Sequence, residues 1–145
     1  VIVPTLEEAK NSLQPVNIKE EKKRTEVAVV VRQFVERFGS FSVDSKMINF
    51  DEIKPMVSKS FADWMEGYKK TVLNGYPQNF KGITTRLIST KNTGSDDTHQ
   101  SFDVATQRKE DTSVSSSIYY QRILLKLVLE NNEWKVDGAY WQTKE

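Results

Sequence analysis

The sequence contains no cysteine and only one histidine, His99. The absence of cysteine excludes thiol catalysis, disulfides and cysteine metal sites. One histidine cannot build the multi-histidine sites of zinc enzymes or oxygenases, so we predict no metal and no cofactor. No apolar run reaches the roughly 18 residues that a membrane-spanning helix needs, so a membrane would be reached only through a segment outside this sequence.

The sequence also lacks an excess of either positive or negative charge. The 145 residues carry 21 basic and 20 acidic side chains and a net charge of +1, which gives no electrostatic case for binding nucleic acid. Hydrophobic residues make up 37% and charged residues 28%, a composition typical of a globular domain with its own core. We therefore expect a single folded domain over residues 19–145.

The first 18 residues are expected to form a tether or a loosely packed arm. They hold two of the four prolines, Pro4 and Pro15, among mixed polar residues. The apolar start Val1-Ile2-Val3 is compatible with the end of a removed signal or membrane anchor, and equally with a cloning boundary.

The most informative stretch runs from Ile118 to Trp141. Two arms rich in β-branched and aromatic residues, 118–129 and 134–141, flank the polar residues 130–133. Asn131-Asn132 can adopt the positive φ angles of a tight turn, so the stretch predicts a long β-hairpin. Gly138, within the second arm, indicates a bulge or a close backbone approach.

An amphipathic helix is predicted before residue 39. Its apolar side chains recur at helical spacing on one stripe, and Gly39 is a typical C-terminal stop. The stripe consists of Val27, Val30, Val31, Phe34, Val35 and Phe38. The valines favour helix only modestly, so this helix needs a sheet or another helix to pack against.

The remaining pattern predicts shorter elements. A helical turn at 51–54 stops at Pro55, and a helix capped by Ser58 or Ser60 runs to about Leu73. From Phe80 the apolar period is two, which predicts strands at 82–90 and 99–109, a turn at 92–97 and a polar loop at 110–117. The fold class is therefore α+β, with N-terminal helices packed in the concave face of a curled four-stranded antiparallel sheet.

This order of elements, closed by the W-x-V-x-G-x-x-W pattern of Trp134 to Trp141, resembles the NTF2-like (cystatin-like) superfamily. The arrangement is most similar to the extracytoplasmic domains of VirB8-like conjugation proteins, and the block from Phe38-Gly39-Ser40-Phe41 to Phe61-x-x-Trp64 also resembles membrane-anchored proteins of small-genome bacteria. The resemblance implies a cone-shaped fold. A VirB8-like relationship implies a membrane anchor, self-association and no catalysis.

Superfamily enzymes work inside the cone with acid–base side chains. The candidates in this sequence are His99, Asp103, Asp137 and Tyr119, with Tyr120 and Gln121 beside them. The histidine and the aspartates also have structural explanations. His99 borders a turn, where a histidine is usually exposed to solvent. The aspartates can pair with basic residues on neighbouring strands, namely Arg86, Arg108, Arg122 or Lys135.

Aromatic residues are candidates for a pocket or an interface. They are Trp64, Tyr68, Tyr120, Trp134, Tyr140 and Trp141. Tyr and Trp suit protein interfaces, but packing in the core and closure of the cone are favoured for most of the set.

Three functions remain open at this point. The favoured one is a non-catalytic interaction domain of a membrane-anchored extracytoplasmic protein at the cell surface or in the periplasm, such as a VirB8-like secretion or conjugation component. The second is a small-molecule binder or an isomerase/dehydratase-type enzyme using Asp103 or Asp137, which requires a hollow cone. The third is a scaffold that dimerises through the outer face of the sheet.

Overall fold

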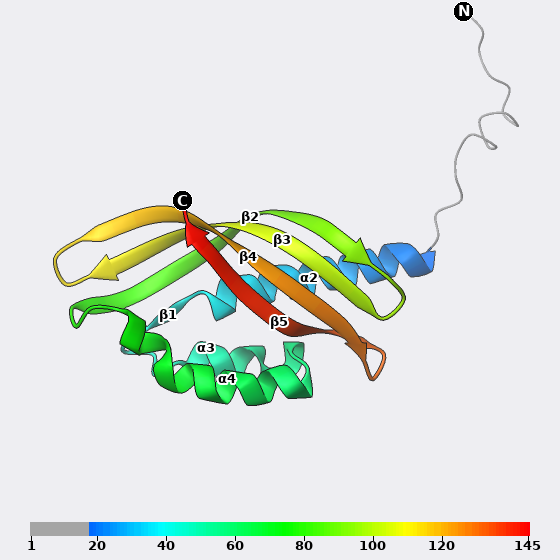
Figure 1. Cartoon of the computed structure of the whole chain (residues 1–145), viewed down its shortest axis with the longest axis horizontal. Helices are drawn as coiled ribbons and strands as arrows, with labels where there is room; N and C mark the ends of the chain where they lie inside the picture. Colours follow the sequence, from blue (N-terminus) through cyan, green and yellow to red (C-terminus); the bar gives the residue numbers. More distant parts are fainter. Residues whose placement is uncertain (1–17) are drawn as a thin grey trace, which may run out of the picture.

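The computed structural model describes residues 18–145, in which helices pack beneath an arched sheet (Figure 1). The helices are α2 (Ile18–Phe38), α3 (Ile48–Ile53) and α4 (Lys59–Thr71), with 3-10 turns η1 (Lys54–Met56) and η2 (Val72–Gly75). The strands are β1 (Phe41–Ser42), β2 (Phe80–Ser95), β3 (His99–Thr112), β4 (Ser116–Glu130) and β5 (Glu133–Lys144). The predicted arm falls on residues that, apart from Ile18, lie outside this description.

The sheet is an antiparallel meander in the order β1-β2-β3-β4-β5. Its four long strands confirm the predicted class, and the two-residue β1 is an addition that pairs only with Ile83 and Gly82. Asn131 and Asn132 have φ angles of 52° and 63°, which confirms the tight turn between β4 and β5. The register of β4 against β5 shifts opposite Gly138, which confirms the predicted bulge.

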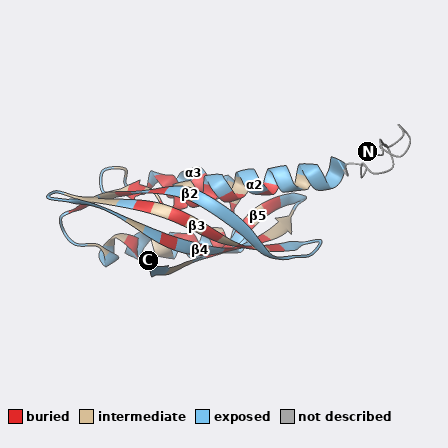
Figure 2. Cartoon of the chain, turned by 90° about the horizontal axis from the view of Figure 1, so that it is seen from above, coloured by how far each residue is buried: buried red, intermediate tan, exposed pale blue. Residues whose placement is uncertain are grey.

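Helix α2 lies against the concave face of the sheet and provides the centre of the core (Figure 1). Phe34 and Val35 have no exposed surface, and they pack with the inward-facing Val104 and Ile123 of β3 and β4. Buried and exposed positions alternate along β3 and β4 (Figure 2). Because alternate strand residues face opposite sides of a sheet, the buried positions form the inner layer and the exposed ones the convex face. The predicted stripe is thus the face that the sheet covers.

Helix α4 begins where the sequence predicts. The Ser58 side chain caps it by accepting a hydrogen bond from the Phe61 amide at 3.2 Å. Helix α3 starts at Ile48, earlier than the predicted turn at 51–54, because Phe50 and Ile53 are both drawn into the core.

Two predicted loops are shorter than expected. Strand β2 continues through 92–95 because Asn92 and Ser95 pair with Phe102 and Gln100 of β3, so the turn is confined to residues between Ser95 and His99. The polar segment 110–117 is likewise mostly strand, since Glu110 pairs with Ser117 across β3 and β4. Cross-strand pairing here overrides the low β-propensity of these residues.

Within residues 18–145, no helix combines the length and the apolar character needed to cross a membrane.

Candidate functional site

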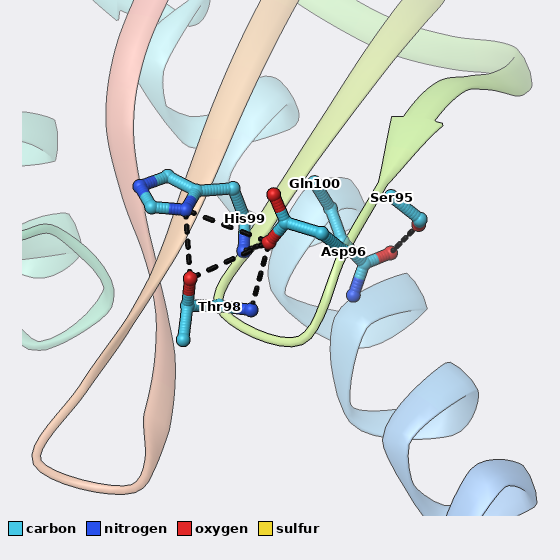
Figure 3. Close-up of polar contacts among 5 residues, drawn as sticks. All are labelled: Ser95, Asp96, Thr98, His99 and Gln100. Atoms are coloured by element: carbon cyan, nitrogen blue, oxygen red, sulfur yellow. Dashed lines mark hydrogen bonds and ion pairs between the residues drawn. The ribbon is translucent and has the colours of Figure 1, made fainter.

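His99 is the first residue of β3, and its side chain contacts Thr98 and Asp96 of the turn before it (Figure 3). Its Nδ1 is 2.8 Å from the Thr98 hydroxyl and 3.6 Å from Asp96 Oδ1. The backbone amides of Thr98 and His99 donate to the same carboxylate oxygen at 2.9 and 2.7 Å, and these bonds lower the pKa of Asp96. The imidazole is therefore exposed, and its contacts belong to the turn that leads into β3.

Asp103 lies on the convex face, opposite to its buried neighbours Phe102 and Val104 on β3. Its Oδ2 accepts a hydrogen bond from Arg122 at 3.1 Å, and Arg122 also lies 3.6 Å from Glu145. Asp103 Oδ1 is buried and has no hydrogen-bond partner among the described residues. The carboxylate is thus held by a neighbouring strand and points away from the interior of the cone.

Asp137 is the extra residue of the bulge in β5, since Gly138 and Val136 pair with successive residues of β4. Its Oδ1 accepts hydrogen bonds from the hydroxyls of Ser58 at 2.6 Å and Ser60 at 2.9 Å. Because Ser58 is also the cap of α4, Asp137 ties the start of that helix to the sheet.

The inner face carries one buried cation, Arg108, which was not among the catalytic candidates. Its side chain is 3% exposed. It donates hydrogen bonds to Thr85 Oγ1 at 3.0 Å, Gln121 Oε1 at 2.8 Å and the Gly39 carbonyl at 3.2 Å. All three acceptors are uncharged, so the guanidinium joins β2, β3, β4 and the end of α2 without an ion pair at these contacts. The period-two inward face of β3, continued from Phe102 to position 108, was the signal that would have found it.

Tyr119 and Glu110 lie near Arg108 at the same end of the interior. Burial raises the pKa of Tyr119 to about 12, and the Arg108 charge only partly opposes this shift. Burial also raises the pKa of Tyr76, and the Arg108 charge partly opposes this shift as well. The Tyr119 hydroxyl and Glu110 Oε1 are buried and have no hydrogen-bond partner within residues 18–145. These polar atoms are enclosed by neighbouring atoms and do not line an open chamber.

A continuous series of stacked groups crosses the interior from the surface to Arg108. Trp64, 47% exposed, stacks on Tyr68 with centroids 4.8 Å apart. Tyr68 stacks on Phe38 at 5.5 Å, and Phe38 lies parallel to Trp141 at 6.4 Å. Trp141 in turn lies 3.9 Å from the Arg108 guanidinium. Aromatic rings and the Arg108 guanidinium therefore fill this end of the cone.

The other aromatic candidates lie elsewhere. Trp134 is buried near the β4–β5 turn, with the Lys23 ammonium 5.2 Å from its ring. Tyr120 and Tyr140 lie on the convex face, 48% and 52% exposed. The structure thus brings together Trp64, Tyr68 and Trp141 and separates them from the other three.

The described residues assemble no cluster of three or more side chains suited to hold a metal ion. A surface groove of about 660 Å³ lies between the end of α2, β1 and the start of β2. Its lining mixes carboxylates such as Glu36 and Asp44 with Arg37 and Lys81. It lies outside the concave interior, apart from the predicted acid–base residues.

No protein-family model and no curated protein matches the sequence. Solved structures do resemble the fold. An IcmL-like type IV secretion system protein from Legionella pneumophila gives a TM-score of 0.66 at 12% identity, covering 82% of this chain and 91% of the other. CagV, a VirB8 homolog of the type IV secretion system of Helicobacter pylori, gives 0.65 at 10% identity, covering 81% and 97%.

A third similar structure, from Novosphingobium aromaticivorans, is classed provisionally as a scytalone dehydratase. It gives a TM-score of 0.57 at 14% identity, covering 87% of this chain and 90% of the other. At these identities the likeness concerns the fold alone. It confirms the predicted NTF2-like fold and its resemblance to VirB8-like domains.

Proposed function

We propose that this chain is the non-catalytic assembly domain of a membrane-anchored extracytoplasmic protein, a VirB8-like component of a secretion or conjugation apparatus. In this proposal residues 19–145 form one domain, and residues 1–18 tether it to an anchor. The observation that carries the proposal is the filled interior, where Arg108 is held by Thr85, Gln121 and Gly39 and covered by Trp141. The secretion-system neighbours of the same fold support it.

The surface supports binding of protein over catalysis. Leu124 and Tyr140 are cross-strand partners on the convex face, 38% and 52% exposed, and Tyr120 lies further along β4. Tyrosine beside an aliphatic residue is the kind of surface that protein interfaces bury. Self-association through this face belongs to the proposal, and a protein that stays monomeric at high concentration in sedimentation experiments would count against that part.

A location and fractionation experiment tests the proposal. Protease added to cells with a permeabilised outer envelope should degrade the domain while a cytoplasmic marker survives, and the full-length protein should sediment with membranes. Chemical cross-linking in the same cells should shift it into larger complexes. A domain that stays protected until the cytoplasm is released would contradict the proposal.

A dehydratase- or isomerase-type enzyme is the second candidate. It is supported by the neighbour classed as a scytalone dehydratase and by the Tyr119 and Glu110 atoms that lack partners beside Arg108. It needs a carboxylate and a tyrosine that face an open interior, whereas Asp103 pairs with Arg122 and Asp137 binds Ser58. The carboxylates that the sequence singled out therefore favour the assembly domain.

A further inference from the structure

The outer edge of β2 is covered by another strand over only a short part of its length. Strand β1 pairs with β2 only at Gly82 and Ile83, and within residues 18–145 no other strand borders this edge. Two side chains occupy the next edge amides. Ser40 Oγ, two residues past the end of α2, accepts a hydrogen bond from the Thr85 amide at 2.8 Å, and Glu36 Oε2 of α2 accepts one from the Leu87 amide at 3.0 Å. From residue 88 to 95 every residue is exposed. An edge of that kind is a template for an added strand.

A groove of about 390 Å³ runs beside this edge, between β2 and α2. Its floor is apolar, with Val27 and Val31 from α2 and Leu87 and Phe102 from the sheet. Helix α2 contacts β2, and side chains of both elements line the groove. Thr90 of the edge strand also lines the groove, so a strand added at the edge would direct every second side chain toward it.

The positive charges around the groove favour a negatively charged occupant. Its lining contains two arginines, Arg24 and Arg32, and no carboxylate. Arg24 has only a solvent-exposed contact with Glu21 at 3.5 Å, which contributes little and is easily exchanged. Lys91 lies on the exposed edge segment, whereas Asp96 and Asp97 come after β2 ends.

We propose that the edge of β2 from Ser89 to Ser95 binds an extended acidic segment of a partner protein. The segment adds one strand to the sheet and places alternate apolar side chains in the groove beneath α2, and its carboxylates face Arg24 and Arg32. Main-chain hydrogen bonds supply affinity in this mode of binding, and the groove and the arginines supply selectivity. The seven-residue edge is about 23 Å long at strand spacing. This inference rests on the proposed assembly function and names a surface and a partner chemistry for it.

The test uses the whole chain, labelled with ¹⁵N, and two blocked decapeptides. In one peptide valine alternates with glutamate, and in the other lysine replaces glutamate. Adding the acidic peptide should shift the amide resonances of residues 89–95 and slow amide exchange there at least tenfold. The lysine peptide should bind at least tenfold more weakly, and raising the salt from 0.1 to 0.5 M should weaken the acidic peptide several-fold.

Arg32→Glu should reduce binding of the acidic peptide at least tenfold. Lys70→Glu, the same charge change on the exposed side of α4, should leave it unchanged. Equal binding of both peptides, shifts confined to another surface, or equal effects of the two variants would overturn the inference. Shifts at residues 89–95 on concentrating the protein alone would assign the edge to a second copy of the chain. Shifts there on deleting residues 1–17 would assign it to the chain's own N-terminus. Either result would overturn the inference.

The inference and the proposed function fail separately. If the domain is extracytoplasmic and cross-links into complexes but does not bind the acidic peptide, the proposed function stands and the edge site is wrong. If the domain stays in the cytoplasm but binds the acidic peptide, the proposed function is wrong and the edge site stands.

Discussion

The guanidinium of Arg108 lies 3.9 Å from the centroid of the Trp141 ring, so the cation of β3 is covered by the closing strand of the sheet. Contacts of a cation with an aromatic face gain strength when both groups are removed from water, and Arg108 is almost completely buried. Trp141 also lies parallel to Phe38 of α2. One ring therefore connects the polar end of the interior to the central helix.

The carboxylate of Asp137 is expected to act as a structural tether. Asp137→Ala leaves the buried Ser58 hydroxyl without its acceptor and should lower the free energy of unfolding by about 1–2 kcal/mol, measured by urea denaturation. Ser58→Ala removes the helix cap and the same tether and should cost about as much. Because the two residues share one contact, the double variant should lose clearly less than the sum.

Ser60→Ala is the matched control, since its exposed hydroxyl binds the same carboxylate at 2.9 Å. It should cost no more than about 0.5 kcal/mol. Additive losses for Ser58→Ala and Asp137→Ala would contradict the tether.

Gly39 is needed because the chain passes close to the sheet at the end of α2. A Cβ there would lie 2.6 Å from Thr85 Oγ1 and 3.0 Å from Trp141 Cζ2. Gly39→Ala should therefore destabilise the domain by about 1–3 kcal/mol. Gly67, in α4, has no atom within 4 Å of the added Cβ, so Gly67→Ala should instead stabilise by about 0.5–1 kcal/mol. If the melting temperatures of the two variants shift in the same direction, the close approach of Gly39 to Thr85 and Trp141 is contradicted.

Ionisation of Tyr119 should couple stability to alkaline pH. Burial raises its pKa from 10.0 to about 12, so the folded state holds the phenolic proton more tightly than the unfolded state does. The stabilisation is complete below pH 10 and is lost as the pH rises through about 12. A titration followed by tyrosinate absorbance should lose its highest step in Tyr119→Phe.

The same variant tests the unpartnered hydroxyl of Tyr119. Removing a buried group that makes no hydrogen bond should leave stability at pH 7 unchanged or raise it slightly. A loss above about 1 kcal/mol would contradict this and show that the hydroxyl makes a stabilising contact.

Sequence patterns were sufficient for the layers of this fold because they depend on periodicity. The stripe from Val27 to Phe38 faces the sheet, and the Asn131-Asn132 turn closes the last hairpin. The lengths of β2 and β3 could not be predicted in the same way. Polar residues such as Asn92 and Glu110 stay in strands only because a neighbouring strand pairs with them, and that pairing is not encoded locally.

The placement of single polar side chains was harder still. Asp103 and Asp137 were candidates because a strand aspartate is uncommon, but the face that each occupies depends on register, and for Asp137 on a bulge. Arg108 was considered only as a pairing partner, although the alternation of β3 puts it on the inner face. Extending the inward face of β3 by one more step of two residues, from Thr106 to position 108, would have identified Arg108 as an inward-facing residue.

The central claim is that the interior of the cone is a packed core in which Arg108 is structural. Urea unfolding of Arg108→Ala, beside the exposed control Arg86→Ala, tests it most directly. The account predicts a loss of at least about 3 kcal/mol for Arg108→Ala, because Thr85, Gln121 and the Gly39 carbonyl all lose their donor, and a change within about 0.5 kcal/mol for the control. An Arg108→Ala protein as stable as the unmodified chain, or more stable, would contradict the claim and assign the arginine to a ligand.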